Sequence, residues 1–110
     1  MNRLLAAAAA AAGLLALSAN VCAQSQEDTQ KMLLGLYIVS IAIDTCDLDI
    51  TKEQEQRLNH WTEWAEEKLN VSDRKLDKAY SAMEQEAEKD KDKFCAQMKP
   101  VALKTVKELP

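Results

Sequence analysis

A run of twelve almost uninterrupted apolar residues, MLLGLYIVSIAI at positions 32–43, constrains the fold of this chain more than any other feature. A transmembrane helix needs about 20 apolar residues, and Lys31 and Asp44 place a charge at each end of this run. The run is therefore too short to span a membrane. Its β-branched residues would also suit a strand, but no other segment has the pattern of a partner strand. We therefore expect a helix that is apolar on all sides and buried by its neighbours.

The first 23 residues have the pattern of a secretory signal peptide. Arg3 provides a positive start, an apolar stretch covers positions 4–17, and small and polar residues lead to Ala23. Lipidation at Cys22 and a retained anchor are the alternatives, although Val21 beside that cysteine fits a lipidation signal poorly. We expect cleavage after residue 23, a single domain at residues 24–110, a periplasmic or secreted location and no membrane span in the mature protein.

Two cysteines, Cys46 and Cys95, remain after this cleavage. In an oxidising compartment they are expected to form one disulfide, and their wide separation favours a structural role over a redox role. Closing a loop of about 50 residues stabilises a fold by about 4 kcal/mol in the chain-entropy model. The mature domain is near the lower size limit for a single hydrophobic core, so this covalent link is expected to matter.

Helical signals fill the rest of the chain. Thr51 and Gln54 have the spacing of a capping box, which predicts the start of a second helix. Ser72 is expected to cap a third helix, and the short turn before it predicts an antiparallel hairpin of the second and third helices. A fourth helix is expected to begin at Asp90 or Asp92. The predicted fold class is all-α, a small bundle of about four helices stapled by one disulfide.

A proline inside the predicted fourth helix is the main irregularity in this pattern. Pro100 lacks an amide hydrogen and its ring clashes with the preceding turn, so we expect it to kink the helix or to begin a new one.

Charge and motifs argue against several functions. Removal of Arg3 from the 14 basic residues leaves 13 against 18 acidic side chains, a net charge of −5 that disfavours nucleic acid as a partner. A calcium loop beginning at Asp47 has Lys52 and Leu58 where a glycine and a glutamate are needed, so we expect a solvated turn with a weak cation site as the alternative. His60 is the single histidine and lacks a haem-attachment motif. We expect no cofactor, no metal and no enzymatic activity.

The apolar run also provides the functional hypothesis. Three amphipathic helices are not expected to cover it completely, and the exposed remainder would bind another protein or a second copy of this chain. The predicted interaction surface comprises Leu33, Leu36, Tyr37, Ile41 and Trp64. The alternatives are an acid-stress chaperone of the envelope and an immunity or inhibitor protein that binds an exported enzyme through its acidic face.

In secreted size, helical pattern and a single disulfide around about 48 residues, the chain resembles the acid-activated periplasmic chaperones. The similarity is one of architecture, since those proteins place their first cysteine near the start of the first long helix, whereas Cys46 follows an apolar helix here. No sequence motif is shared, so the resemblance assigns no role to any residue.

Overall fold

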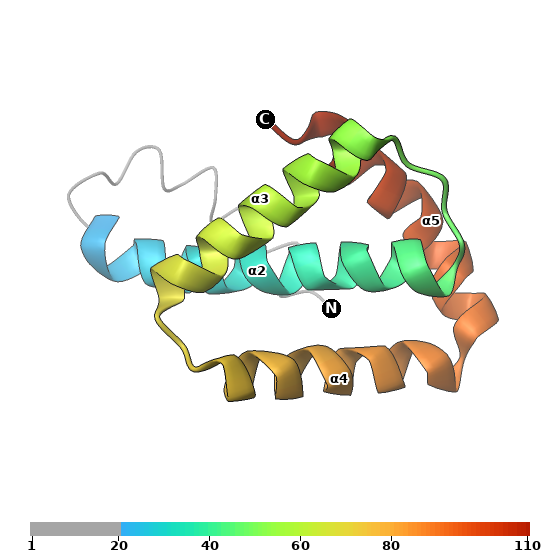
Figure 1. Cartoon of the computed structure of the whole chain (residues 1–110). Coiled ribbons are helices and arrows are strands. Elements are labelled where there is room, and N and C mark those ends of the chain that lie inside the picture. The colour runs from blue at the N-terminus through green and yellow to red at the C-terminus, as the bar shows by residue number, and fades with distance from the viewer. Residues whose placement is uncertain (1–20) are drawn as a thin grey trace.

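The structure, a computed structural model, describes the backbone from residue 21 to residue 110 and the side chains from residue 26. Most of the predicted signal peptide lies outside the described residues. Four helices follow one another, with no strand in the described part of the chain: α2 (Val21–Thr45), α3 (Lys52–Leu69), α4 (Asp73–Lys89) and α5 (Lys91–Glu108) (Figure 1). This arrangement confirms the predicted all-α bundle of about four helices.

The apolar run at positions 32–43 forms the central part of α2, as predicted. In Figure 1, α2 crosses the middle of the molecule, with α3 above it, α4 below it and α5 at its C-terminal end. All three of these helices contact α2. A helix that is apolar on all sides lowers the free energy most when every side is covered, and this placement covers most of the run while Leu34 stays 38% exposed. In residues 21–110, no helix is long and apolar enough to cross a membrane.

The predicted hairpin of α3 and α4 is wrong. The two helices are joined by a short turn, at which Asn70 adopts the left-handed conformation with φ of 52°, but they make little direct contact. Instead, α2 lies between them and each packs against it (Figure 1). The apolar sides of α2 offer each helix more surface to bury than the other helix does, so packing on α2 overrides the tendency of neighbouring helices to pair.

The predicted disulfide is present and links the end of α2 to the first turns of α5. Cys46 and Cys95 are bonded, with their Cα atoms 5.6 Å apart. Two backbone hydrogen bonds close the C-terminal end of α2 around Cys46. The Cys46 amide donates to the Ala42 carbonyl at 2.9 Å, and the Leu48 amide donates to the Ile43 carbonyl at 3.0 Å. The second bond closes around a residue in the left-handed region, which is the geometry of a Schellman motif.

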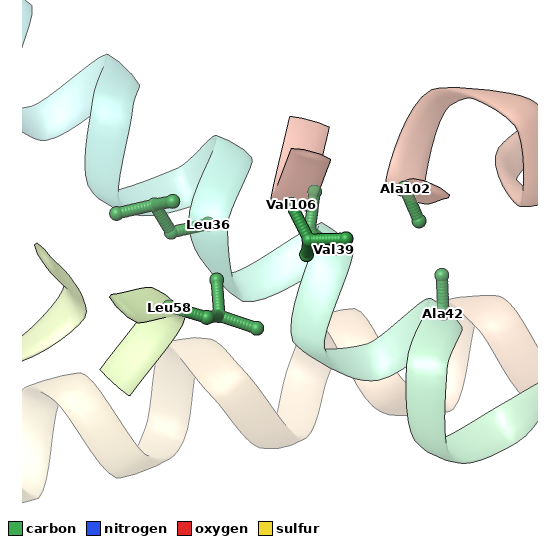
Figure 2. Close-up of a cluster of buried hydrophobic side chains, with 6 residues drawn as sticks. All are labelled: Leu36, Val39, Ala42, Leu58, Ala102 and Val106. Atoms are coloured by element: carbon green, nitrogen blue, oxygen red, sulfur yellow. The ribbon is translucent and has the colours of Figure 1, made fainter. Parts of the chain in front are cut away.

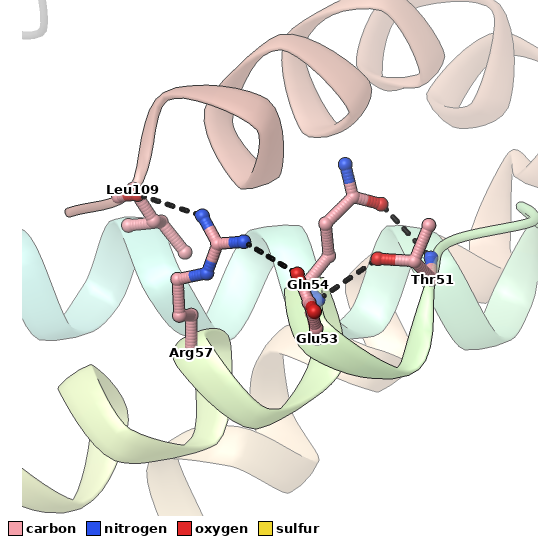
Figure 3. Close-up of polar contacts among 5 residues, drawn as sticks. All are labelled: Thr51, Glu53, Gln54, Arg57 and Leu109. Atoms are coloured by element: carbon pink, nitrogen blue, oxygen red, sulfur yellow. Dashed lines mark hydrogen bonds and ion pairs between the residues drawn. The ribbon is translucent and has the colours of Figure 1, made fainter.

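The predicted capping box is also present (Figure 3). The Thr51 amide donates to the Gln54 side-chain oxygen at 2.9 Å, and the Gln54 amide donates to the Thr51 hydroxyl at 3.0 Å. At the start of α4, the Ser72 hydroxyl accepts from the Lys75 amide at 3.3 Å. These bonds satisfy amides that a helix start otherwise leaves unpaired.

The start and middle of α5 differ in detail from the expectation. Asp90 occupies the N-cap position, but its side chain makes no capping hydrogen bond. The helix continues through Pro100, so of the two expected outcomes, a kink or the start of a new helix, the second is wrong. Proline removes one backbone bond within the helix, and burial of Ala102 and Val106 beyond it favours continued helix over a break.

Buried side chains form two clusters on different sides of α2. The α5-side cluster joins α2 to α3 and α5, and consists of Leu36, Val39, Ala42, Leu58, Ala102 and Val106 (Figure 2). The α4-side cluster has three buried members, Leu33, Tyr37 and Ala65, against which the half-buried Leu76, Tyr80 and Met83 of α4 pack. The α5-side cluster is therefore the larger part of the core.

Candidate functional site

The structure buries four of the five residues of the predicted interaction surface. Leu33, Leu36, Tyr37 and Ile41 are only 3%, 4%, 4% and 1% exposed, so they do not form an accessible surface in this monomer. Part of the apolar run stays exposed, as expected, but at Leu34 and not at these four residues. The reason is the central position of α2, which lets three helices cover it from different directions. Trp64 is 37% exposed and remains accessible.

The other exposed large apolar residues are outside the predicted surface, and two of them are close to α4. Leu34 of α2 and Val71 of the turn before α4 are each 38% exposed, and both line the same groove. Neither residue belongs to the predicted interaction surface. The sequence could have indicated both as candidates for exposed apolar residues, because Leu34 belongs to the apolar run and Val71 is an apolar residue in the turn just before α4.

This groove, which we term the apolar groove, lies between the first half of α2 and the start of α4. It has a volume of about 550 Å³. Its apolar lining comes from Leu33, Leu34, Leu69, Val71, Leu76 and Ala79. Its polar lining comes from Glu27 and Lys75 in addition to two glutamines. A mixture of apolar and polar residues is the usual composition of a protein-binding surface.

A second groove, the acidic groove, lies on the other side of α4, where α2, α3 and α4 meet. It has a volume of about 380 Å³. Four carboxylates line it and no basic side chain does: Asp44, Glu55, Glu66 and Asp77. Tyr37 and Leu76 line both grooves, so a narrow wall of side chains separates the two.

Tyr37 connects the three helices around the acidic groove. Its hydroxyl on α2 donates a hydrogen bond to a carboxylate oxygen of Glu66 on α3. Its ring meets the ring of Tyr80 on α4 edge to face, with the centroids 5.1 Å apart. Burial, and then the hydrogen bond to the Glu66 carboxylate, raise the pKa of Tyr37 far above the ordinary tyrosine value. The hydroxyl therefore stays protonated and remains a donor at physiological pH.

Tyr80 also has a raised pKa. Burial is the main cause, and the negative charges of Asp44 and Glu84 act in the same direction. Both tyrosines of the chain thus meet at one site and both are held in the neutral form.

An aromatic row lies on α3, away from the acidic groove. His60 meets Trp61 with ring centroids 5.2 Å apart, and Trp61 meets Trp64 at 5.7 Å, both edge to face. The ammonium of Lys68 lies 5.6 Å from the centre of the Trp64 ring, which is cation–π geometry. Trp61 is half-buried against the α5-side cluster. The row therefore combines a half-buried tryptophan with an exposed one.

Two side chains of α3 bind the C-terminal residues. The Trp61 indole nitrogen donates to the Pro110 carbonyl oxygen at 3.0 Å. The Arg57 guanidinium donates to the Leu109 carbonyl oxygen at 3.4 Å, as Figure 3 shows. Arg57 also forms an exposed ion pair with Glu53 at 3.4 Å. These contacts give Trp61 a structural role, because they join α3 to the segment after α5.

The residues considered for cation binding do not converge. Asp47 and Asp49 are exposed in the connection between α2 and α3, and Asp44 faces the acidic groove. Within residues 21–110, no group of three or more histidine, cysteine, aspartate or glutamate side chains has the geometry to hold a metal ion.

Comparison of the chain with protein-family models, with curated proteins and with solved structures finds no match.

Proposed function

We propose that this chain is a non-enzymatic exported protein that acts by binding another protein through the apolar groove. The observation that carries the proposal is the composition of that groove, whose lining combines six apolar residues with four polar or charged ones. Burial of exposed apolar side chains such as Leu34 and Val71 is the main favourable term in protein association. The functional surface thus includes one face of the apolar run, together with residues of the turn before α4.

Export rests on two further features. The first 23 residues have the pattern of a cleavable secretory signal, and the chain contains a structural disulfide of the kind that persists in oxidising compartments. We therefore assign the protein to the periplasm or to the secreted fraction. Mass spectrometry of the exported protein tests this assignment, because cleavage after Ala23 and the absence of free thiols are both expected.

The binding proposal is tested by placing a charge in the groove. Leu34→Asp and Val71→Asp are expected to abolish capture of the partner from an envelope extract. Val101→Asp is the matched control, since Val101 is 48% exposed and lies outside the groove. Circular dichroism must show that all three variants keep their helices. Equal capture by the groove variants and by the control would contradict the proposal.

A second copy of this chain is the alternative occupant of the groove. Light scattering on the purified protein distinguishes the two cases. A dimer that dissociates in Leu34→Asp but not in Val101→Asp would identify self-association as the use of this surface.

The acidic groove favours a second candidate function, that of an immunity or inhibitor protein. Four carboxylates without a basic neighbour in the lining would complement a basic surface on an exported enzyme. In that case, Glu55→Gln with Asp77→Asn should weaken binding and reduce its salt dependence. Glu63→Gln with Glu67→Gln, on α3 outside this groove, is the matched control. The chaperone alternative stays a prediction, which client-aggregation assays at acid and neutral pH would test.

A further inference from the structure

The helix α4, which separates the two grooves, is attached to the rest of the molecule differently from the other helices. In the part of the chain that the structure describes, four covalent or hydrogen-bonded links join helices to one another or to the C-terminal residues: the disulfide, the Tyr37–Glu66 hydrogen bond, and the hydrogen bonds from Arg57 and Trp61. None of them ends on α4. Its own side-chain bonds, at Ser72–Lys75 and at Glu86–Lys89, are local to the helix and its cap.

Apolar contact is therefore what holds α4 in place, and the buried surface is small. Ala87 is the one buried residue of its seventeen. Leu76, Tyr80 and Met83 pack against the α4-side cluster but are only half-buried. Leu76 also lines both grooves, so part of its side chain is not covered by other residues.

We propose that α4 is a separate opening unit, which loses its contacts with α2 while α2, α3 and α5 remain folded together. Regions with few buried apolar contacts and few links to their surroundings open at a lower free energy than the whole molecule. Opening removes the wall between the two grooves and exposes Leu33 and Tyr37, which the sequence analysis placed on an interaction surface. The closed structure buries these two residues, and the open state presents them. This inference concerns folding free energies and does not depend on the proposed function.

Native-state hydrogen exchange on the oxidised, exported chain tests the proposal without a variant. If α4 opens alone, its amides exchange with a weak dependence on urea, because little surface is exposed in the opening. The slowest amides of α2 and α5 exchange with the full urea dependence of global unfolding. The same strong dependence in α4 as in α2 would overturn the proposal.

A matched pair of methionine variants sharpens this test. Met83 packs on the α4-side cluster and Met98 of α5 packs on the α5-side cluster, and both are half-buried. Met98→Ala raises the free energy of the closed and the open state equally, so exchange of α2 and α5 becomes roughly tenfold faster while exchange of α4 is unchanged. Met83→Ala raises only the closed state, so exchange becomes faster in α4 as well as in α2 and α5. Faster exchange of α4 in Met98→Ala would show that α4 opens only with the whole molecule.

Discussion

The neighbouring helices bury the two sides of α2 by different means. On the side of α5, six buried residues from three helices interlock, and a disulfide fixes the end of α2 to α5. Side chains of α3 add hydrogen bonds to the two C-terminal residues. On the side of α4, three buried residues meet a row of half-buried ones, with an open groove on each flank.

This difference indicates that the stability of so small a protein is concentrated on one side of α2, whereas the groove that we propose for binding lies on the side of α4. The α5 side combines a cluster with a covalent link, so we expect it to contribute more to the stability of the fold than the α4 side does. The α4 side is then free to expose apolar residues such as Leu34 and Val71, whose exposure contributes nothing to the stability of the monomer. Four measurements test the difference between the two sides of α2.

Loss of the disulfide is expected to have the largest effect. Cys46→Ala with Cys95→Ala should lower the free energy of unfolding by about 4 kcal/mol, because the cross-link restricts the unfolded chain over a loop of about 50 residues. Urea denaturation of the oxidised protein and of this variant measures the difference. Reduction of the wild-type protein is the control and should reproduce the loss. An unchanged urea midpoint would mean that the α5 side does not depend on its covalent link.

Substitution of one leucine in each cluster compares the two clusters directly. Leu58 is 4% exposed in the α5-side cluster, whereas Leu76 is half-buried beside α2 on the α4 side. Leu58→Ala should cost about 3 kcal/mol and Leu76→Ala about 1 kcal/mol, since the second side chain gives up less buried surface. Thermal or urea denaturation gives both values. Equal costs would remove the distinction between the two sides.

The helix caps provide a smaller comparison. Thr51→Ala removes a reciprocal capping box at α3 and should lower the free energy of unfolding by about 1 kcal/mol. Ser72→Ala removes a single longer bond at α4 and should cost about 0.5 kcal/mol. Urea midpoints measure both losses, and Thr51→Ser is the control that keeps the hydroxyl. A larger loss at Ser72 than at Thr51 would contradict this order.

The tyrosine pair predicts an effect that is absent at neutral pH. Tyrosine ionises at about pH 10 in the unfolded chain, whereas burial and the Glu66 hydrogen bond raise the pKa of Tyr37 in the fold, and burial raises that of Tyr80. Above this pH the folded state holds more protons than the unfolded state, so the free energy of unfolding falls as pH rises.

Urea titrations at increasing alkaline pH should show this fall, and it should be smaller in Tyr37→Phe. Since the chain has two tyrosines and both belong to the pair, tyrosinate absorbance reports on this site. Its appearance near pH 10 in a protein that remains folded would show that the pair is not shielded as described.

Much of the fold could be predicted from the sequence because the decisive signals are local or covalent. The capping box depends on two side chains three residues apart, and the pairing of Cys46 with Cys95 follows from the count of cysteines after signal cleavage. The apolar run was too short for a membrane and lacked a partner strand, which left a buried helix. Each of these inferences needs no knowledge of how the helices are arranged in space.

The arrangement itself could not be predicted, and the errors in the candidate site follow from it. A short turn favours pairing of α3 with α4, but the competition of α2 for both helices depends on tertiary contacts. With α2 at the centre, Leu36 and Ile41 become core residues, and the accessible apolar surface moves to Leu34 and Val71. The acidic groove was equally hidden, because its carboxylates come from three helices that the sequence does not place together.

The link between the end of α2 and α5 also has a consequence for the order of folding. The apolar run emerges early when the chain is made or exported, whereas its α5-side partners lie about half the chain later, as the separation of 49 residues between the bonded cysteines indicates. Contacts between distant segments slow folding, because the intervening loop must close first. The apolar run of α2 therefore lacks its α5-side contacts until α5 has been made. During that interval the cell must keep the partly folded chain from aggregating.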